Sequence, residues 1–486
     1  MKYKTLLLLM MFVAVSFLLP AQGLKVEPGT CIKVETGTTL DISGGDLFLK
    51  SDASGDASLI DLGNVSYTGG GEAKVERYLT NGKWHLVSSP ITAALSGMFE
   101  SDFLQVHTES TNAYTDVSSL TYGLIPAKGY ALWSVETEPS TEIFTGTTNT
   151  GSQSFDFTKS DLPDDDDEGW NFVGNPYPSV LDWDEVTKPA NLSATIWLFD
   201  PTIGENGDYR YYIKDAGKAN FTSQYIPSGQ GFFVRSTEGD GTGTLTFDNS
   251  ARTHNDETVF YKSDVENMML VLKATGNNIT TQTAIRFKEE ATAQIDRLYD
   301  VNKITSGSPD VPVVYTLCEN QNMAINTLPS IKGNEIVPLY FEAGMDGSYA
   351  FTATEMETLG DEIPVFLEDI ALNYIQDLRA NPDYSFEYAS GAVKEFNIHF
   401  KDATGIEQPE KLNVLCYLNN NMLHVNFPES EFGKATISVY NITGQQILIR
   451  QTSLANNDIA FNGSQAVYLV SITTNEGVFS TKVFNR

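Results

Sequence analysis

The stretch Trp84-His-Leu-Val-Ser-Ser-Pro90 recurs in this chain as Trp170-Asn-Phe-Val-Gly-Asn-Pro176, with Trp, Val and Pro in register 86 positions apart. A second pair of similar segments, here called the second marks, follows at an offset of 101 positions. Ile125-Pro-Ala-Lys-Gly-Tyr-Ala-Leu-Trp133 matches Ile226-Pro-Ser-Gly-Gln-Gly-Phe-Phe-Val234. This period is too long for the coils of a solenoid. The sequence therefore predicts a duplicated β unit, with copies at about 84–158 and 170–250.

Short apolar runs between turn residues extend the β prediction to the rest of the chain. Residues 24–80 hold four brief strand patterns separated by glycines, which predicts a short β-solenoid-like cap. Residues 256–403 hold about seven strand patterns and one helical pattern at 289–299, which predicts a β-sandwich. The expected fold is all-β and multi-domain: a cap at 24–80, a duplicated domain at 81–255, a sandwich at 256–403 and a last domain at 404–486.

The last domain shows alternating apolar and polar residues in short runs. The runs are separated by Asn, Gly and Ser turns, which indicates a small antiparallel sandwich of the immunoglobulin-like kind. The runs are 412–418, 422–427, 436–440, 446–450, 467–472 and 478–484.

Three features of this tail also resemble a known family. They are Thr404-Gly405-Ile406, Val439-Tyr-Asn-Ile-Thr-Gly-Gln445 and a Val-Tyr-Leu-Val strand before Thr481-Lys-Val-Phe484. Together they resemble the C-terminal sorting domain of type IX secretion (Por secretion) cargo, found in secreted and surface proteins of Bacteroidota. The resemblance implies export through the type IX machinery and removal of the domain by a sortase-like protease. The sorting-motif residues it implies are Gly405, Tyr440, Gly444, Tyr468 and Lys482; a generic immunoglobulin-like module is the alternative.

The first residues support export. Lys2 and Lys4 precede an apolar run at 6–19, and Ala21-Gln22-Gly23 is a small-x-small cleavage site. This pattern predicts a Sec signal peptide over residues 1–23. Later runs are too short for a transmembrane helix, so we expect a protein on the outer cell surface or outside the cell.

Charge and cysteine usage narrow the classes of partner. The chain has 63 acidic and 31 basic residues, for a net charge of −32. Such a field disfavours nucleic acid and anionic lipid. Cys31, Cys318 and Cys416 are too few and too widely spaced for a disulfide framework, although one pair stays open.

Motifs for catalysis or cofactors are missing from the sequence. The five histidines lack metal-ligand spacing, and Cys-x-x-Cys, Gly-x-Ser-x-Gly and phosphate-loop patterns do not occur. We expect no cofactor, with calcium as the one open case. Hard carboxylate oxygens suit calcium, and the candidate ligands are Asp164, Asp165, Asp166 and Asp167; a solvated acidic loop is the alternative.

Aromatic residues concentrate in the duplicated region. Sugar-binding faces use exposed rings flanked by Asp and Asn, and Asn175, Tyr177, Asp182 and Trp183 form a candidate patch of this kind. The alternative is that the tryptophans, above all Trp84 and Trp170, belong to the core. The expected function is a non-enzymatic, adhesin-like binder of glycan or protein. A polysaccharide-degrading enzyme with a carboxylate pair and a structural surface spacer are the alternatives.

Overall fold

The fold is described by a computed structural model. It describes residues 23–237, 242–254, 268–305, 307–333, 335–401, 414–419, 422–427, 434–441, 445–461, 463–464, 466–473 and 478–484. The predicted signal peptide, except Gly23, lies outside these residues. The chain divides into two compact units, one ending at Ile398 and one beginning at His399. Within the described residues, both units consist of strands, and the first also has a few one-turn 3-10 helices, which confirms the all-β, multi-domain class. No described helix has the length and hydrophobicity needed to cross a membrane.

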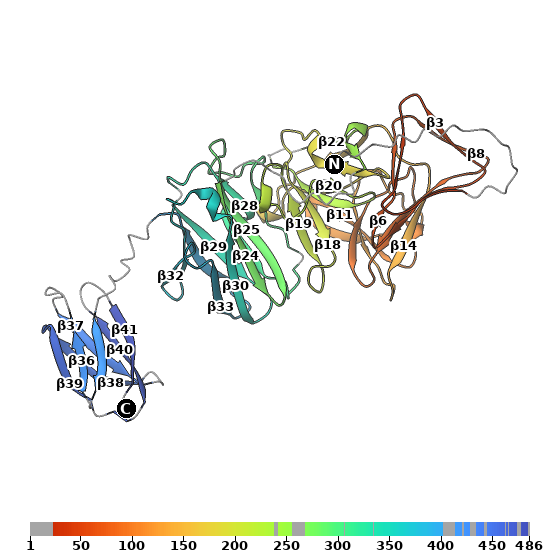
Figure 1. The fold of residues 1–486 in the computed structure, drawn as a ribbon. Coiled ribbons are helices and arrows are strands. Elements are labelled where there is room, and N and C mark those ends of the chain that lie inside the picture. The colour runs from red at the N-terminus through yellow and green to blue at the C-terminus, as the bar shows by residue number, and fades with distance from the viewer. Residues whose placement is uncertain are drawn as a thin grey trace, which may run out of the picture. The chain divides into compact units, whose positions relative to one another are not determined.

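The first unit begins with two coils of a parallel β-solenoid and the start of a third (Figure 1, red to orange). Three strands of the first coil each pair in parallel with a strand one coil later. This pairing confirms the solenoid-like cap. A strand of the first copy, β14 (Ser140–Gly146), then adds antiparallel to β9, so the two regions share one core. The solenoid strands are β1 (Leu24–Val26), β2 (Cys31–Val34), β3 (Thr39–Ser43), β4 (Leu47–Leu49), β5 (Ser51–Asp52), β6 (Gly55–Asp56), β7 (Ser58–Asp61), β8 (Asn64–Thr68) and β9 (Ala73–Leu79).

The duplication appears as two four-stranded antiparallel sheets with the same strand order. The first copy has the order β10-β13-β11-β12 and the second has β16-β21-β18-β19, so each strand has its equivalent in chain order. The final strands of the copies, β15 and β22, pair with each other. The strands are β10 (Trp84–Val87), β11 (Phe103–Thr108), β12 (Ala113–Asp116), β13 (Tyr130–Trp133), β15 (Gln153–Phe157), β16 (Trp170–Gly174), β17 (Val180–Asp182), β18 (Ile196–Asp200), β19 (Asp208–Tyr212), β20 (Tyr225–Ile226), β21 (Gly231–Arg235), β22 (Gly243–Phe247) and β23 (Arg252–Thr253).

The strand register corrects the predicted alignment of the second marks by one residue. Trp84 pairs with Trp133, whereas Trp170 pairs with Arg235 and not with Val234. The reason is the turn before the strand. Its left-handed residue is Ala127 in the first copy and Gly229 in the second, so the two Ile-Pro dipeptides do not occupy equivalent places.

The two copies contact each other reciprocally. The N–H of Ser88 donates to the carbonyl of Gly229 at 2.8 Å, and the N–H of Gly174 donates to the carbonyl of Ala127 at 3.0 Å. Ser88 and Gly174 hold equivalent places, as do Ala127 and Gly229. Such exchanged contacts are the mark of a two-fold relation, here between two halves of one chain.

The third part of the first unit is one sheet of eleven strands among the described residues. The sheet folds back on itself, because Phe341 on β29 contacts Phe351 on β30 and Phe386 on β33, which stand far away in the strand order. The result is the sandwich-like layering that the sequence predicts. The strands are β24 (Met268–Gly276), β25 (Ile279–Phe287), β26 (Val301–Asn302), β27 (Val313–Cys318), β28 (Gln321–Leu328), β29 (Ile336–Glu342), β30 (Gly347–Thr354), β31 (Phe366–Asp369), β32 (Tyr374–Asp377), β33 (Asp383–Tyr388) and β34 (Lys394–His399).

One predicted element of this part is wrong. Residues 289–299 form a chain of turns instead of a helix. Side-chain oxygens compete with helical hydrogen bonds there: the N–H of Leu298 donates to Asp296 Oδ1, and the N–H of Ile295 donates to Glu319 Oε2.

The second unit is a small antiparallel sandwich, as predicted. One sheet has the order β35-β36-β39 and the other β38-β37-β40-β41. Its core holds Leu423, Val439 and Val470. The described strands are β35 (Leu415–Asn419), β36 (Met422–Asn426), β37 (Ala435–Tyr440), β38 (Gln446–Thr452), β39 (Asn456–Ala460), β40 (Val467–Thr473) and β41 (Val478–Phe484).

The one-turn 3-10 helices all lie in the first unit in the described part of the chain, and the three cysteines are free thiols. The helices are η1 (Ser96–Phe99), η2 (Glu109–Thr111), η3 (Asp165–Asp167), η4 (Trp183–Glu185), η5 (Gly217–Ala219), η6 (Asn249–Ala251) and η7 (Met356–Leu359).

Candidate functional site

The candidate site is a pocket of about 470 Å³ where the two copies face each other, here called the aromatic pocket. This volume is within the usual range of small-molecule sites. Four aromatic side chains line the pocket, and its polar side-chain groups are two amides, the hydroxyls of one threonine and two tyrosines, and the indole N–H of Trp84. The described residues that line it are Trp84, Leu86, Gln105, Tyr114, Ala131, Phe199, Asn206, Tyr209 and Thr305.

The pocket is open because the first copy carries small or narrow side chains where the second carries large ones. Ala131 is equivalent to Phe233, because they pair with the equivalent residues Leu86 and Phe172. Gln105 is in turn equivalent to Trp197, by their pairing with Ala131 and Phe233.

In the second copy the same face is closed by stacked rings. Phe172 stacks on Phe233 at 4.6 Å between centroids, and Trp170 meets Trp197 edge to face at 4.8 Å. All four residues are at most 4% exposed. Trp84, the equivalent of Trp170, is only half-buried. The duplicated tryptophans therefore have different environments, which the sequence alone did not distinguish.

The wall from the second copy is held in place by hydrogen bonds. The loop that carries Asn206 begins at Asp200, which accepts from the N–H of Thr202 at 2.9 Å and pairs with Arg210 at 2.6 Å. The N–H of Asn206 donates to Ser308 Oγ at 3.3 Å. On the same wall, the rings of Phe199 and Tyr209 meet edge to face at 5.2 Å. The pocket is thus formed before any ligand arrives.

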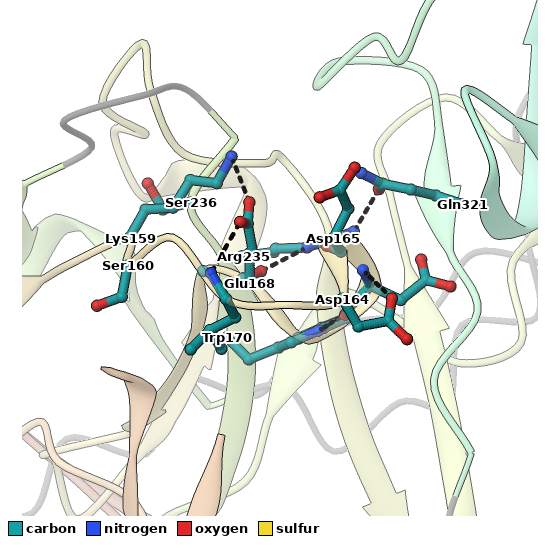
Figure 2. Close-up of polar contacts among 12 residues, drawn as sticks. Lys159, Ser160, Asp164, Asp165, Glu168, Trp170, Arg235, Ser236 and Gln321 are labelled. Carbon is teal, nitrogen blue, oxygen red and sulfur yellow. Dashed lines mark hydrogen bonds and ion pairs between the residues drawn. The ribbon is translucent and has the colours of Figure 1, made fainter. Parts of the chain in front are cut away.

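A second, polar cavity of about 500 Å³ lies around Arg235, and several of its lining groups are joined by hydrogen bonds. Figure 2 shows Arg235 at the centre of these contacts. Its Nε donates to the carbonyl of Glu168 at 2.9 Å, its Nη1 donates to Gln321 Oε1 at 2.7 Å, and its Nη2 donates to the carbonyl of Asp165. The lining residues are Lys159, Arg235, Ser236, Thr237, Thr292, Gln294, Ile295, Asp296, Arg297, Asn302, Glu319 and Gln321.

These contacts assign the polar cavity a structural role. Lys159 forms an ion pair with Glu168 at 3.0 Å, and the guanidinium of Arg235 lies over the ring of Trp170 at 5.2 Å. Burial lowers the pKa of Arg235, yet its donors are matched by protein oxygens. The contacts of Arg235 and Lys159 therefore connect the acidic loop, the second copy and the sandwich.

The acidic run Asp164–Asp167 is on the edge of this network. Asp164 caps the short helix η3, because its Oδ1 accepts from the N–H of Asp166 at 3.0 Å. The amide of Asn112 donates to Asp167 Oδ1 at 2.8 Å, while Asp165 is exposed. No group of three or more His, Cys, Asp or Glu side chains in the described chain is placed to hold a metal ion. Calcium binding at this loop stays a prediction.

The structure corrects the expected sugar-binding patch, because three of its four side chains are buried. Asn175, Tyr177 and Trp183 are each 0% exposed. The hydroxyl oxygen of Tyr177 lies 2.6 and 2.7 Å from the carbonyl oxygens of Gly151 and Phe247, and Trp183 Nε1 donates to the carbonyl of Ala194 at 2.6 Å.

Asn175 and Asp182 also have structural partners within the fold. The amide nitrogen of Asn175 donates to the carbonyls of Ser179, Ile226 and Pro227 at 2.8 to 3.0 Å. Asp182 is half-buried and caps η4 through its Oδ1, which accepts from the N–H of Asp184. None of these four residues offers a free ring face or a free amide, so the patch cannot bind sugar as proposed.

The sorting-motif residues are described only in part. Tyr440 lies in β37, Tyr468 is buried in β40, and Lys482 is exposed in β41. The hydroxyl of Tyr468 donates to the carbonyl of Ser464 at 3.0 Å, which is a structural contact. Gly405 and Gly444 lie outside the described residues.

The chain belongs to a family described as a domain of unknown function (DUF8693), whose match covers residues 13–400 and hence nearly all of the first unit. A search of curated proteins finds no match. Among solved structures, one similar chain comes from work on PorZ, described as an essential bacterial surface component of the type-IX secretion system of Porphyromonas gingivalis. The TM-score is 0.13 and the identity 9%, over 74% of this chain and 56% of that one. The chain thus spans little more than half of that structure's length, and a likeness at this score bears on neither fold nor function.

Proposed function

We propose that this protein is an exported, non-enzymatic binder that holds a glycan in the aromatic pocket. The observation that carries this proposal is the open pocket itself, which is lined by four aromatic rings and by uncharged amide and hydroxyl groups. The C–H bonds on one face of a sugar ring pack on the negative face of an aromatic ring. Amides and hydroxyls such as those of Gln105, Asn206 and Thr305 match sugar hydroxyls as donors and acceptors.

The pocket supports binding better than hydrolysis. Glycoside hydrolysis by the common route needs two carboxyl groups on either side of the bond. The side chains of the described residues that line the aromatic pocket carry neither a carboxylate nor a base. A polysaccharide-degrading enzyme is therefore the weaker proposal, and a plain surface spacer would have no use for a preformed pocket.

The proposed export route and cellular location are based on the sequence. The pattern of residues 1–23 and the tail resemblance support export by Sec and then by type IX secretion, with the sortase-like protease as a partner. The separate compact unit from His399 onward supports a tail that is recognised on its own. Whether the cargo is anchored or released does not affect the pocket, which is formed by the first unit alone.

A glycan-array screen of residues 24–486 tests the binding proposal, followed by calorimetry on each hit. Two variants should abolish the hits. Trp84→Ala removes a stacking ring, and Ala131→Phe fills the pocket with the side chain found at the equivalent place in the second copy. The loss should be at least tenfold in Kd, or about 1.4 kcal/mol.

The matched control is Tyr374→Ala, which removes an aromatic ring that is 49% exposed on β32, outside the pocket. It should bind as the unaltered chain does, and melting curves should show that all variants are folded. Binding that survives both pocket variants, or an array without any hit, would overturn the proposal.

A further inference from the structure

A row of three aromatic residues crosses the sheet that forms the floor of the aromatic pocket. Trp84 on β10 pairs with Trp133 on β13, and Trp133 pairs with Phe103 on β11. Directly paired residues project from the same face of a sheet. This is also the face of Leu86, Ala131 and Gln105, because side chains alternate along each strand. The row therefore begins inside the pocket and leaves it.

The last ring of this row is more exposed than the other two. Trp84 and Trp133 are half-buried and meet edge to face at 5.5 Å, whereas Phe103 is 64% exposed. Phe103 is a large apolar side chain, and the described part of the chain leaves most of it open to solvent. An exposed aromatic continuous with a formed pocket indicates a binding surface.

The length of the row sets the size of the ligand. Neighbouring strands are about 4.8 Å apart, so two steps place Phe103 about 10 Å from Trp84. Two pyranose residues of an extended glycan chain cover a similar length. A sugar in the pocket would thus leave its chain neighbours over Trp133 and Phe103.

Charge sets the kind of sugar. The described pocket lining is uncharged, and the chain as a whole carries a net charge of −32. At the outer end of the row, the carboxylate of Asp102 lies next to Phe103 in sequence and accepts from the N–H of Val135 at 3.0 Å. A uronic acid or sulfated sugar would be repelled there, while a neutral sugar would not.

We propose that the ligand is a neutral, unbranched polysaccharide that binds along the row Trp84–Trp133–Phe103, with one sugar residue seated in the aromatic pocket. This inference rests on the proposed function and specifies its ligand class. It predicts that affinity rises with chain length until the glycan reaches Phe103.

The test uses calorimetry with residues 24–486 and neutral cello-, manno- and laminari-oligosaccharides from disaccharide to hexasaccharide. Oligogalacturonides serve as the charged counterparts. For the series that binds, the hexasaccharide should bind at least tenfold more tightly than the disaccharide. Phe103→Ala should remove most of this gain and leave disaccharide binding unchanged, and the charged series should not bind.

The matched control for Phe103→Ala is Ile143→Ala, which removes an exposed apolar side chain on β14, outside the row. It should keep the full gain with chain length. Equal affinity for short and long chains, or an unchanged gain in Phe103→Ala, would overturn the polysaccharide inference while the pocket proposal stands. Absence of binding by every series, together with an array without hits, would overturn both.

Discussion

His85 lies on β10 on the opposite face from Trp84, and we expect it to make the first unit sensitive to acid. Its ring is 7% exposed, and Nε2 lies 2.9 Å from the carbonyl oxygen of Thr80. Burial lowers the pKa of His85 from 6.5 to about 4. The unfolded chain thus takes up a proton near pH 6.5, while the folded chain does so only near pH 4. Stability present above pH 6.5 is therefore lost as the pH falls toward 4, by about 3 kcal/mol from this residue.

We expect His85→Gln to flatten this loss, because Gln keeps a donor for Thr80 but does not titrate. Urea unfolding of residues 24–401 at a series of pH values between 7 and 4 measures the free energy of unfolding of the variant and of the unaltered chain. Burial also lowers the pKa of His107 and His254, so the variant should lose only part of the pH dependence. His424→Gln in the second unit, tested in the full chain, is the control. An equal pH slope in His85→Gln and the unaltered chain would contradict the expectation.

Single residues also show where sequence reasoning stops. The Asp and Asn around Trp183 suggest an exposed patch, but its N–H is bound by the carbonyl of Ala194, and its ring packs against Phe232, which is far along the chain. The repetition of Trp84 as Trp170 favours a core position for both, although Trp84 is only half-buried. A comparison of the copies in the correct register shows Ala131 against Phe233, a large difference in volume that could have pointed to the pocket.

At the scale of elements, the end of β16 meets the residue that follows β10 at one of the contacts between the copies. Gly174 ends β16, and a Cβ there would lie 2.2 Å from Ser88 Cβ, which is fixed to the backbone and cannot turn away. We expect Gly174→Ala to destabilise the first unit by about 2 kcal/mol or more. Urea midpoints measure this. Gly123→Ala is the control, because a Cβ there meets nothing within 4 Å, and it should shift stability by no more than about 0.5 kcal/mol. Equal effects of the two substitutions would show that the copies do not meet as described.

Elements with strong local signals were predictable, and those set by distant partners were not. The alternation in 436–440 and 467–472 gave β37 and β40 directly. The strand β39 was missed, since Asn456-Asn-Asp-Ile-Ala460 is polar and forms only against β36. The turn before β13 decided the register by the conformation of Ala127, and a non-glycine residue in the left-handed region gives no clear sequence signal.

At the scale of the whole molecule, the proposed binding residues and the proposed export signal lie in different units. The aromatic pocket and the row Trp84–Trp133–Phe103 belong to the first unit, and the residues that resemble a sorting signal belong to the second. A chain that ends at Lys401 should therefore melt as the first unit of the full chain does and bind the same glycans with the same Kd. In a bacterium that uses type IX secretion, it should remain inside the cell, whereas the full chain should reach the surface or the medium.

A point variant tests a single residue of the proposed sorting motif, whereas the truncation removes the whole second unit. Lys482 is exposed on β41, so Lys482→Ala should leave the second unit folded and yet reduce export if this residue is read by the secretion machinery. Lys434→Ala, an exposed lysine of the same unit outside the proposed motif, is the matched control and should be exported normally. Cell fractionation with an antibody to the first unit measures the export of the truncated chain and of both point variants, each compared with the full chain. Normal export of both the truncated chain and Lys482→Ala would remove the assignment of the tail as an address, while the glycan proposal would be unaffected because its residues lie elsewhere.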